Sequence, residues 1–153
     1  MKWTALSQMP CSVARTLAVV GDRWTLMILR DAFLGVRHFD DFQKSLGISR
    51  TIVADRLATL VREAVLSHKP DAKTGRPAYR LTEKGLELYP LIMAIVGWGN
   101  RHYAEPEGPP LLHRHESCGH DMTSVASCSH CHTALDPRDV TVRANPAIAI
   151  AHF

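Results

Sequence analysis

The most constraining feature of this sequence is the short distance between two helix-forming segments near its middle. A first helix is expected over 39–46, where the apolar residues fall on one face, and Gly47 is a typical residue to end it. Ser49, a favourable N-cap, begins a second helix only two residues later. The apolar stripe of this second helix consists of Val53, Leu57, Leu60, Val61 and Ala64. So tight a connection predicts either a helix-turn-helix or a helical hairpin buried in a core.

The outward face of the second helix is polar and partly basic. It carries Thr51, Ile52, Asp55, Arg56, Thr59 and Arg62. The surrounding segment 44–84 has nine Lys and Arg residues against four Asp and Glu residues, although the whole chain has a net charge of only +3. A helix of this kind fits the major groove of DNA, where its first turns reach base edges and its free backbone amides can hold a phosphate. The pattern therefore favours DNA binding, with a solvated basic face as the alternative.

Residues 65–82, "VLSHKPDAKTGRPAYRLT", change from helical to extended periodicity. The segment "DAKTGRP" places turn residues at its centre, and Tyr79 and Leu81 then alternate with polar neighbours. This pattern predicts a β-hairpin with a basic tip formed by Lys69, Lys73 and Arg76, which can contact the DNA backbone or a minor groove. A helix-turn-helix followed by such a hairpin is a winged helix. Two further helices are expected before it, over 12–20 and 22–33.

Two stretches carry a family resemblance: "FDDFQKSLGISRTIVADRLATLVREAVL" and "RPAYRLTEKGLELYPLIMAIVGWG". They resemble the HxlR-type winged helix-turn-helix transcription regulators, which are relatives of the MarR-like group, over about Cys11 to Trp98. The resemblance implies a mainly α fold with a small β-wing. It also implies a homodimer that represses or activates transcription and often responds to electrophiles, oxidants or small aromatic ligands. One position departs from the family pattern, because Ala64 stands where such proteins commonly have Gly.

The expected partner is a double-stranded, palindromic DNA operator with half-sites roughly 34 Å apart. A long helix expected over Lys84 to Tyr103 would support the homodimer, because it is more apolar than one core requires; packing against the N-terminal helices is the alternative. The predicted DNA contacts are Ser49, Arg50, Thr51, Ile52, Asp55, Arg56 and Thr59 on the helix, and Lys69, Lys73 and Arg76 on the hairpin.

Cys11 lies apart from the other three cysteines, directly before the helix that starts at Ser12. The positive end of the helix dipole favours the reactive thiolate at such a position. A lone cysteine is otherwise usually a small buried hydrophobic residue. Because HxlR-type sensors use an N-terminal cysteine for thiol chemistry, the resemblance makes Cys11 a candidate sensor thiol.

The C-terminal segment contains a second candidate site. A proline-rich linker at 105–110 separates a domain at 1–104 from an extension at 111–153 that is too small to bury a sufficient core without help. His115, Cys118, Cys128 and Cys131 together offer a Cys3His set for a closed, structural zinc ion in a small zinc-ribbon-like piece. His113, His120, His130 and His132 are rival ligands, and a tail that binds no metal is the alternative.

An enzyme that uses these residues is the competing class of function. Against a deaminase, no His-x-Glu precedes a Pro-Cys-x-x-Cys motif, and a Cys3His set leaves no open metal position for a hydrolytic water. Against a thioredoxin-like redox enzyme, "CSHC" lacks a βαβ context. An interaction adaptor that no longer binds DNA is a further alternative. Since the chain has neither a membrane-length apolar run nor a signal-peptide pattern, we expect a cytoplasmic protein that contacts no membrane.

Overall fold

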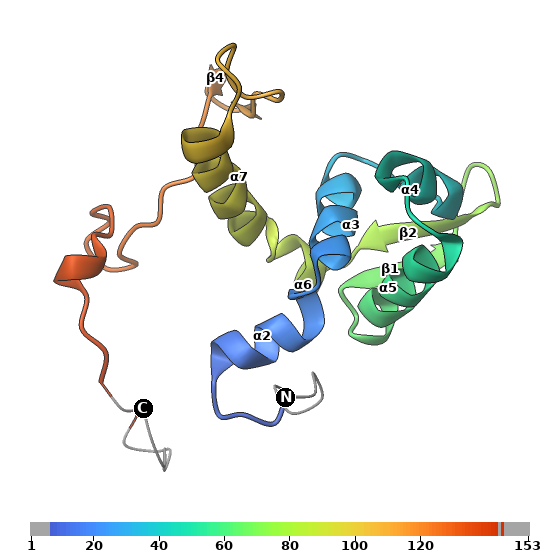
Figure 1. The fold of residues 1–153 in the computed structure, drawn as a ribbon, viewed down its shortest axis with the longest axis horizontal. Helices are drawn as coiled ribbons and strands as arrows, with labels where there is room; N and C mark the ends of the chain where they lie inside the picture. The colour runs from blue at the N-terminus through green and yellow to red at the C-terminus, as the bar shows by residue number, and fades with distance from the viewer. Residues whose placement is uncertain (1–6, 144, 146–153) are drawn as a thin grey trace. The chain divides into compact units, whose positions relative to one another are not determined.

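A computed structural model of the chain describes residues 7–143 and 145 (Figure 1). The chain divides into two compact units, Met1–Ile92 and Met93–Phe153. The division falls within a helix and not at the proline-rich segment 105–110 that the sequence suggested as a linker. Among the residues described, no helix is long and apolar enough to cross a membrane.

The first unit consists of helices, a two-stranded hairpin and the start of a last helix. In chain order these are α2 (Ser12–Val20), α3 (Arg23–Phe33), α4 (Phe39–Leu46), α5 (Arg50–Arg62), β1 (Leu66–Pro70), β2 (Pro77–Leu81), α6 (Glu83–Leu86) and α7 (Tyr89–Tyr103), which continues into the second unit. Figure 1 shows α3, α4, α5 and the hairpin grouped together. The expected mainly α fold with a small β-wing is confirmed.

Local signals explain where the first helices begin and end. The Asp22 carboxylate accepts hydrogen bonds from the backbone N–H groups of Trp24 and Thr25, at 2.9 and 3.3 Å, and so caps α3. Gly47 ends α4 with a left-handed φ of 62°, a conformation that costs glycine little. The Ser49 hydroxyl accepts from the Ile52 N–H at 3.4 Å and caps α5.

The core of this unit is built from α3, α4, α5 and the hairpin. Its fully buried apolar side chains include Ile28, Leu29, Phe42, Val53, Leu57, Leu60, Val65 and Leu66. The buried face of α5 thus matches the expected stripe at Val53, Leu57 and Leu60, whereas Val61 is half-buried and Ala64 lies beyond the helix and is exposed. Burial of one face leaves the opposite face of α5 open to solvent.

The hairpin pairs β1 with β2 in antiparallel register, from Leu66 opposite Leu81 to Pro70 opposite Pro77. One face of the hairpin contacts the helices, because Leu66 on that face is buried and the Tyr79 ring packs edge-on against the Phe42 ring. We call β1, β2 and their connecting turn the wing. Its position in the sequence is as predicted.

The junction between the wing and α6 explains part of the motif "YRLTEKG". The Thr82 hydroxyl accepts a hydrogen bond from the Gly85 N–H at 3.1 Å and donates one to the Ala64 carbonyl at 2.6 Å. This one side chain therefore caps the start of α6 and also binds the backbone just after α5. A Cβ on Gly85 would lie 2.2 Å from the Val65 carbonyl oxygen. Glycine is therefore required here by close backbone approach.

The single helix expected over Lys84 to Tyr103 is wrong in one respect: it is two helices, α6 and α7. Pro90 occupies the second position of α7, and proline has no N–H with which to continue a helix from α6. The segment does carry apolar side chains that the core leaves uncovered, because Leu91, Ile95 and Trp98 are exposed on α7.

The second unit contains little regular structure beyond α7. It has two short antiparallel strands, β3 (Arg114–His115) and β4 (His120–Asp121), and the 3-10 helix η1 (Pro137–Asp139). None of residues 111–143 is buried.

Candidate nucleic-acid interface

The exposed face of α5 presents the residues expected to contact DNA. Ser49, Arg50, Thr51 and Asp55 are exposed, while Ile52, Arg56 and Thr59 are half-buried. Arg50 is held in place from α4, because its guanidinium lies 2.7 Å from the Asp40 carboxylate and stacks over the Phe39 ring at 4.6 Å. An exposed pair of this kind adds little stability, but it restricts where the arginine can reach.

Arg56 occupies a different environment from its neighbours. Its Nε lies 3.4 Å from the carboxylate of Asp22, the residue that caps α3, and its Nη2 lies 3.5 Å from Asp55. The Nε is buried and has no hydrogen-bond partner of good geometry in the described chain. Arg56 therefore links α5 to the start of α3 in this structure, a contact that sequence reasoning missed because Asp22 lies far away in the chain.

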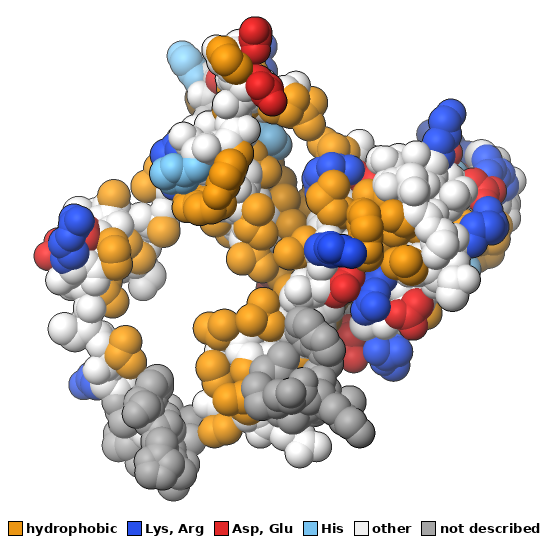
Figure 2. Space-filling view, in the orientation of Figure 1, with side chains coloured by type: hydrophobic (Ala, Val, Ile, Leu, Met, Phe, Trp, Pro, Cys, Tyr) orange, Lys and Arg blue, Asp and Glu red, His pale blue; other side chains and the backbone are white. Residues whose placement is uncertain are grey.

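The tip of the wing carries the other predicted contacts. Lys69, Lys73 and Arg76 are exposed, and within the described part of the chain their charged groups form no ion pair. Figure 2 shows Lys and Arg side chains distributed over the region of the helix-turn-helix and the wing, with fewer acidic side chains among them. These unpaired cations are free to meet phosphate groups.

Asp71 organises the turn between the two strands of the wing. Its carboxylate accepts hydrogen bonds from the N–H of Lys73, at 3.0 Å, and from the N–H and hydroxyl of Thr74, and it pairs with Arg80. The hydrogen bond from the Lys73 N–H is the largest of the causes that hold the pKa of Asp71 below its usual value. The sequence identified the turn here, but not the residue that shapes it.

Two residues before α4 attach the wing to the helices. The Arg37 carbonyl accepts from the Tyr79 N–H at 2.7 Å, and the His38 Nδ1 donates to the Pro77 carbonyl at 2.9 Å. The Tyr79 ring also stacks on the His68 ring, with centroids 4.2 Å apart. These bonds set the position of the wing beside α4 and α5, and no local signal in the sequence indicates them.

Comparison with known proteins agrees with this geometry. Residues 19–107 match the family described as HxlR-like helix-turn-helix. The chain belongs to this family. It is 40% identical to an uncharacterized HTH-type transcriptional regulator of Mycobacterium tuberculosis over 136 residues, which cover 88% of this chain and 86% of the relative. It is also 30% identical to the HTH-type regulator YdeP of Bacillus subtilis, over 60% of this chain and 73% of the relative.

Among solved structures, the HxlR-like chain is similar to PA1607, which is described as a candidate transcription factor. The TM-score is 0.83 and the identity 35%, over 92% of this chain and 99% of PA1607. That share is too large to be confined to the winged helix, so the likeness includes part of the C-terminal segment. The redox regulator HypR in its reduced form shares the fold at lower identity, 24% over 60% of this chain and 95% of HypR, with a TM-score of 0.53. The chain is a transcriptional regulator and not an enzyme.

Cys11 lies at the N-cap of α2 and is exposed, so the alternative of a buried hydrophobic residue does not apply to this chain. Its side chain makes no capping hydrogen bond. The thiol is therefore open to reagents from solvent.

The predicted metal ligands form two pairs. His115 Nδ1 lies 3.3 Å from Cys118 Sγ, and Cys128 and Cys131 lie at the two ends of a second turn. Hydrogen bonding with the Thr133 hydroxyl, followed by contributions from the Thr133 backbone and the Cys128 thiol, lowers the pKa of Cys131 to about 7. Among the described residues, no three or more His, Cys, Asp or Glu side chains gather closely enough to hold a metal ion.

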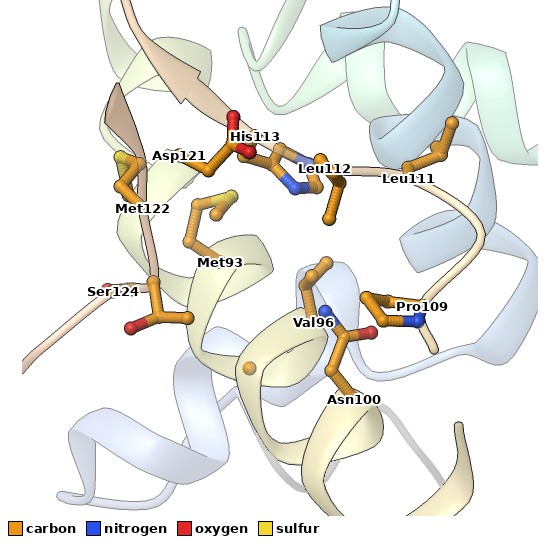
Figure 3. A pocket seen from close by; sticks show the side chains of 12 residues that line it. Met93, Val96, Asn100, Pro109, Leu111, Leu112, His113, Asp121, Met122 and Ser124 are labelled. Carbon is orange, nitrogen blue, oxygen red and sulfur yellow. The ribbon is translucent and has the colours of Figure 1, made fainter. Parts of the chain in front are cut away.

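A pocket of about 220 Å³ lies within the second unit (Figure 3). Met93, Val96 and Asn100 of α7 form one side of it. Leu112 and His113 line it from the segment before β3, and β4 and the residues after it complete the lining. This contact between α7 and the extension explains why the chain does not divide at 105–110.

Proposed function

We propose that this HxlR-like regulator is a homodimer that binds a palindromic double-stranded DNA operator through α5 and the wing. The observation that carries the proposal is the placement of an exposed polar face on α5 beside a wing tip with unpaired cations. The seven predicted residues of α5 and its N-cap would lie in the major groove. Lys69, Lys73 and Arg76 would contact phosphates next to it.

The apolar surface of two helices supports the homodimer. Val13 and Leu17 are exposed on α2, and Leu91, Ile95 and Trp98 are exposed on α7. Figure 2 shows hydrophobic side chains over both helices. An isolated chain gains nothing from exposing such surface, whereas a second copy would cover it.

DNA binding is tested by fluorescence anisotropy with labelled DNA from upstream of the protein's own gene. The wild-type affinity should fall steeply as salt is added. Lys73→Ala should weaken binding to this DNA and to a random duplex alike, and should reduce the salt slope by about 1, because one phosphate contact is lost. Arg138→Ala removes a similarly exposed cation from the C-terminal unit and serves as the matched control.

A protein that binds neither duplex in dilute buffer would overturn the proposal and favour an adaptor without DNA binding. An Lys73→Ala variant with the affinity and salt slope of the wild type would show that the wing does not contact DNA. Arg56→Ala should relax the sequence preference if Arg56 leaves Asp22 to reach a base. If Arg56 only positions α5, the loss of affinity should be equal for both duplexes.

We further propose that Cys11 is the sensor thiol of this regulator. Its exposure at the start of α2, a helix with an exposed apolar face, would let a modification alter how two copies pair. HypR, which shares this fold, is named as a redox regulator, so the fold is compatible with control by thiol modification.

The sensor role is tested by adding a quinone to the DNA complex. The Cys11 thiolate would add to a ring carbon, forming a carbon–sulfur bond while a proton passes to the quinone oxygen. Wild type should release DNA, whereas Cys11→Ser should retain it. Peptide mass spectrometry should locate the adduct on Cys11. Equal release from both proteins would refute this role.

A further inference from the structure

We propose that the C-terminal unit binds one zinc ion per chain through two matching turns, residues 115–119 and 128–132. Each turn holds two of the four ligands His115, Cys118, Cys128 and Cys131. Zinc binding by these turns does not depend on DNA binding, so a test of one leaves the other open.

The two turns have the same backbone hydrogen bond. The Gly119 N–H donates to the His115 carbonyl at 2.8 Å, and the His132 N–H donates to the Cys128 carbonyl at 2.9 Å. The final residue of each turn is left-handed, with a φ of 71° at Gly119 and 60° at His132. His115 therefore corresponds to Cys128, and Cys118 corresponds to Cys131, although the sequence alone shows only equal spacing.

Each turn is also closed by a short antiparallel pairing. In the first, His115 pairs with His120, and the Met122 N–H donates to the His113 carbonyl at 2.7 Å. In the second, Ser127 pairs with Ala134, and the Cys128 N–H donates to the Thr133 carbonyl at 2.9 Å. Both turns thus present two side chains from a small closed loop.

The atoms of the first pair are close enough to share an ion. His115 Nδ1 and Cys118 Sγ are 3.3 Å apart. Two ligands of one tetrahedral zinc, with Zn–S about 2.3 Å and Zn–N about 2.0 Å, are roughly 3.5 Å apart. In the second turn, the His130 N–H donates to Cys128 Sγ at 3.5 Å.

The correspondence between the turns selects His115 from the rival histidines. His113 precedes the first turn and lines the pocket beside α7. His120 Nδ1 donates to the Cys118 carbonyl at 2.7 Å and is engaged there. His132 holds the left-handed position that Gly119 holds in the first turn, and His130 lies between the two cysteines of the second turn. Only His115 takes the place that a cysteine takes in the second turn.

A bound ion would stabilise the extension, which has little else to hold it in one conformation. None of residues 111–143 is buried, so hydrophobic burial contributes little to its order. Each turn alone offers two ligands, which is half of a closed structural site, and among the described residues no third candidate ligand lies close to either pair, so one ion would have to draw the two turns together. An ion that joins both turns would supply the stability that the missing core does not.

The test uses the full-length protein and measures zinc content by mass spectrometry and cobalt binding by absorption. Wild type should contain one zinc per chain, and cobalt should give a thiolate charge-transfer band with tetrahedral visible bands. Cys118→Ser and Cys128→Ser, one in each turn, should each lower zinc affinity at least 100-fold. His115→Ala should do the same.

Two variants serve as matched controls: Ser129→Ala, in the middle of the second turn, and His113→Ala, a neighbouring histidine. Both should keep one zinc per chain. The cobalt spectrum of wild type provides a reading that does not depend on how well a variant folds. Absence of stoichiometric metal, loss of binding from changes in only one turn, or a Cys128–Cys131 disulfide in freshly purified protein would overturn the proposal.

Discussion

At the scale of single residues, Ala64 shows how this chain departs from an ideal helix end. It follows α5 with a φ of 55°, and the next N–H, from Val65, bonds back to the Leu60 carbonyl at 2.9 Å. That bond closes the helix, so the left-handed conformation is needed here. Alanine adopts it at a cost that glycine avoids. The family resemblance pointed to this position, and the backbone explains why glycine is common there.

Ala64→Gly should therefore raise the free energy of unfolding by about 1 kcal/mol, because the left-handed strain is relieved. The measurement is urea unfolding followed by circular dichroism. Ala58→Gly, at an exposed position inside α5, is the opposite control and should lower the same free energy by about 1 kcal/mol. Destabilisation by both changes would contradict our account of Ala64.

At the scale of elements, the wing is positioned by bonds along β2 and within its turn. Backbone and side-chain bonds from Arg37 and His38 attach Tyr79 and Pro77 of β2 to the segment before α4, while Asp71 closes the tip. A hairpin of two strands is only marginally stable alone, so these attachments decide whether it stays ordered. The basic side chains depend on that order to meet DNA in one orientation.

Asp71→Ala should loosen the tip of the wing and weaken DNA binding without altering the helices. Hydrogen exchange at the N–H groups of Lys73 and Thr74 provides the measurement, with exchange in α3 as the internal reference. Because folding lowers the pKa of Asp71, its contribution is complete above the ordinary value of 3.8 and is lost as pH falls through the lower folded value. Protection of these amides in wild type should therefore persist to about pH 4. Unchanged exchange in the variant would contradict this role.

At the scale of the whole molecule, the described chain leaves apolar surface that its own packing does not use. Ile95 and Trp98 are 46% and 52% exposed on α7, and Leu17 is 44% exposed on α2. Surface of this kind on helices flanking a DNA-binding domain is the physical basis of the proposed homodimer.

Ile95→Glu should convert the protein to a monomer, because a carboxylate buried between two copies would lose its hydration. Light scattering after size-exclusion chromatography measures the change, and affinity for a palindromic operator should fall with it. Ala94→Glu adds the same charge at the neighbouring exposed position and is the matched control. A monomeric wild type, or a dimer that tolerates Ile95→Glu, would refute this interface.

The helix-turn-helix and the wing could be predicted because the sequence patterns that indicate them are local. The cap at Ser49, the helix end at Gly47 and the change of periodicity after Val65 all act within a few residues. The break between α6 and α7 was missed although Pro90 marks it, because the apolar pattern continues across it. The DNA-contact residues were chosen from one face of a helix and from the hairpin, and their contacts with DNA remain predictions.

The sequence by itself thus determined the helices from α2 to α5, the turn between α4 and α5, the wing and the family. Only the tertiary structure decided that Asp22 engages Arg56, that Arg37 and His38 anchor the wing, and that residues 115–119 match residues 128–132. The physical reason is range: capping, periodicity and turn preference depend on neighbours in the chain. Contacts between distant segments depend on which surfaces the packed core brings together.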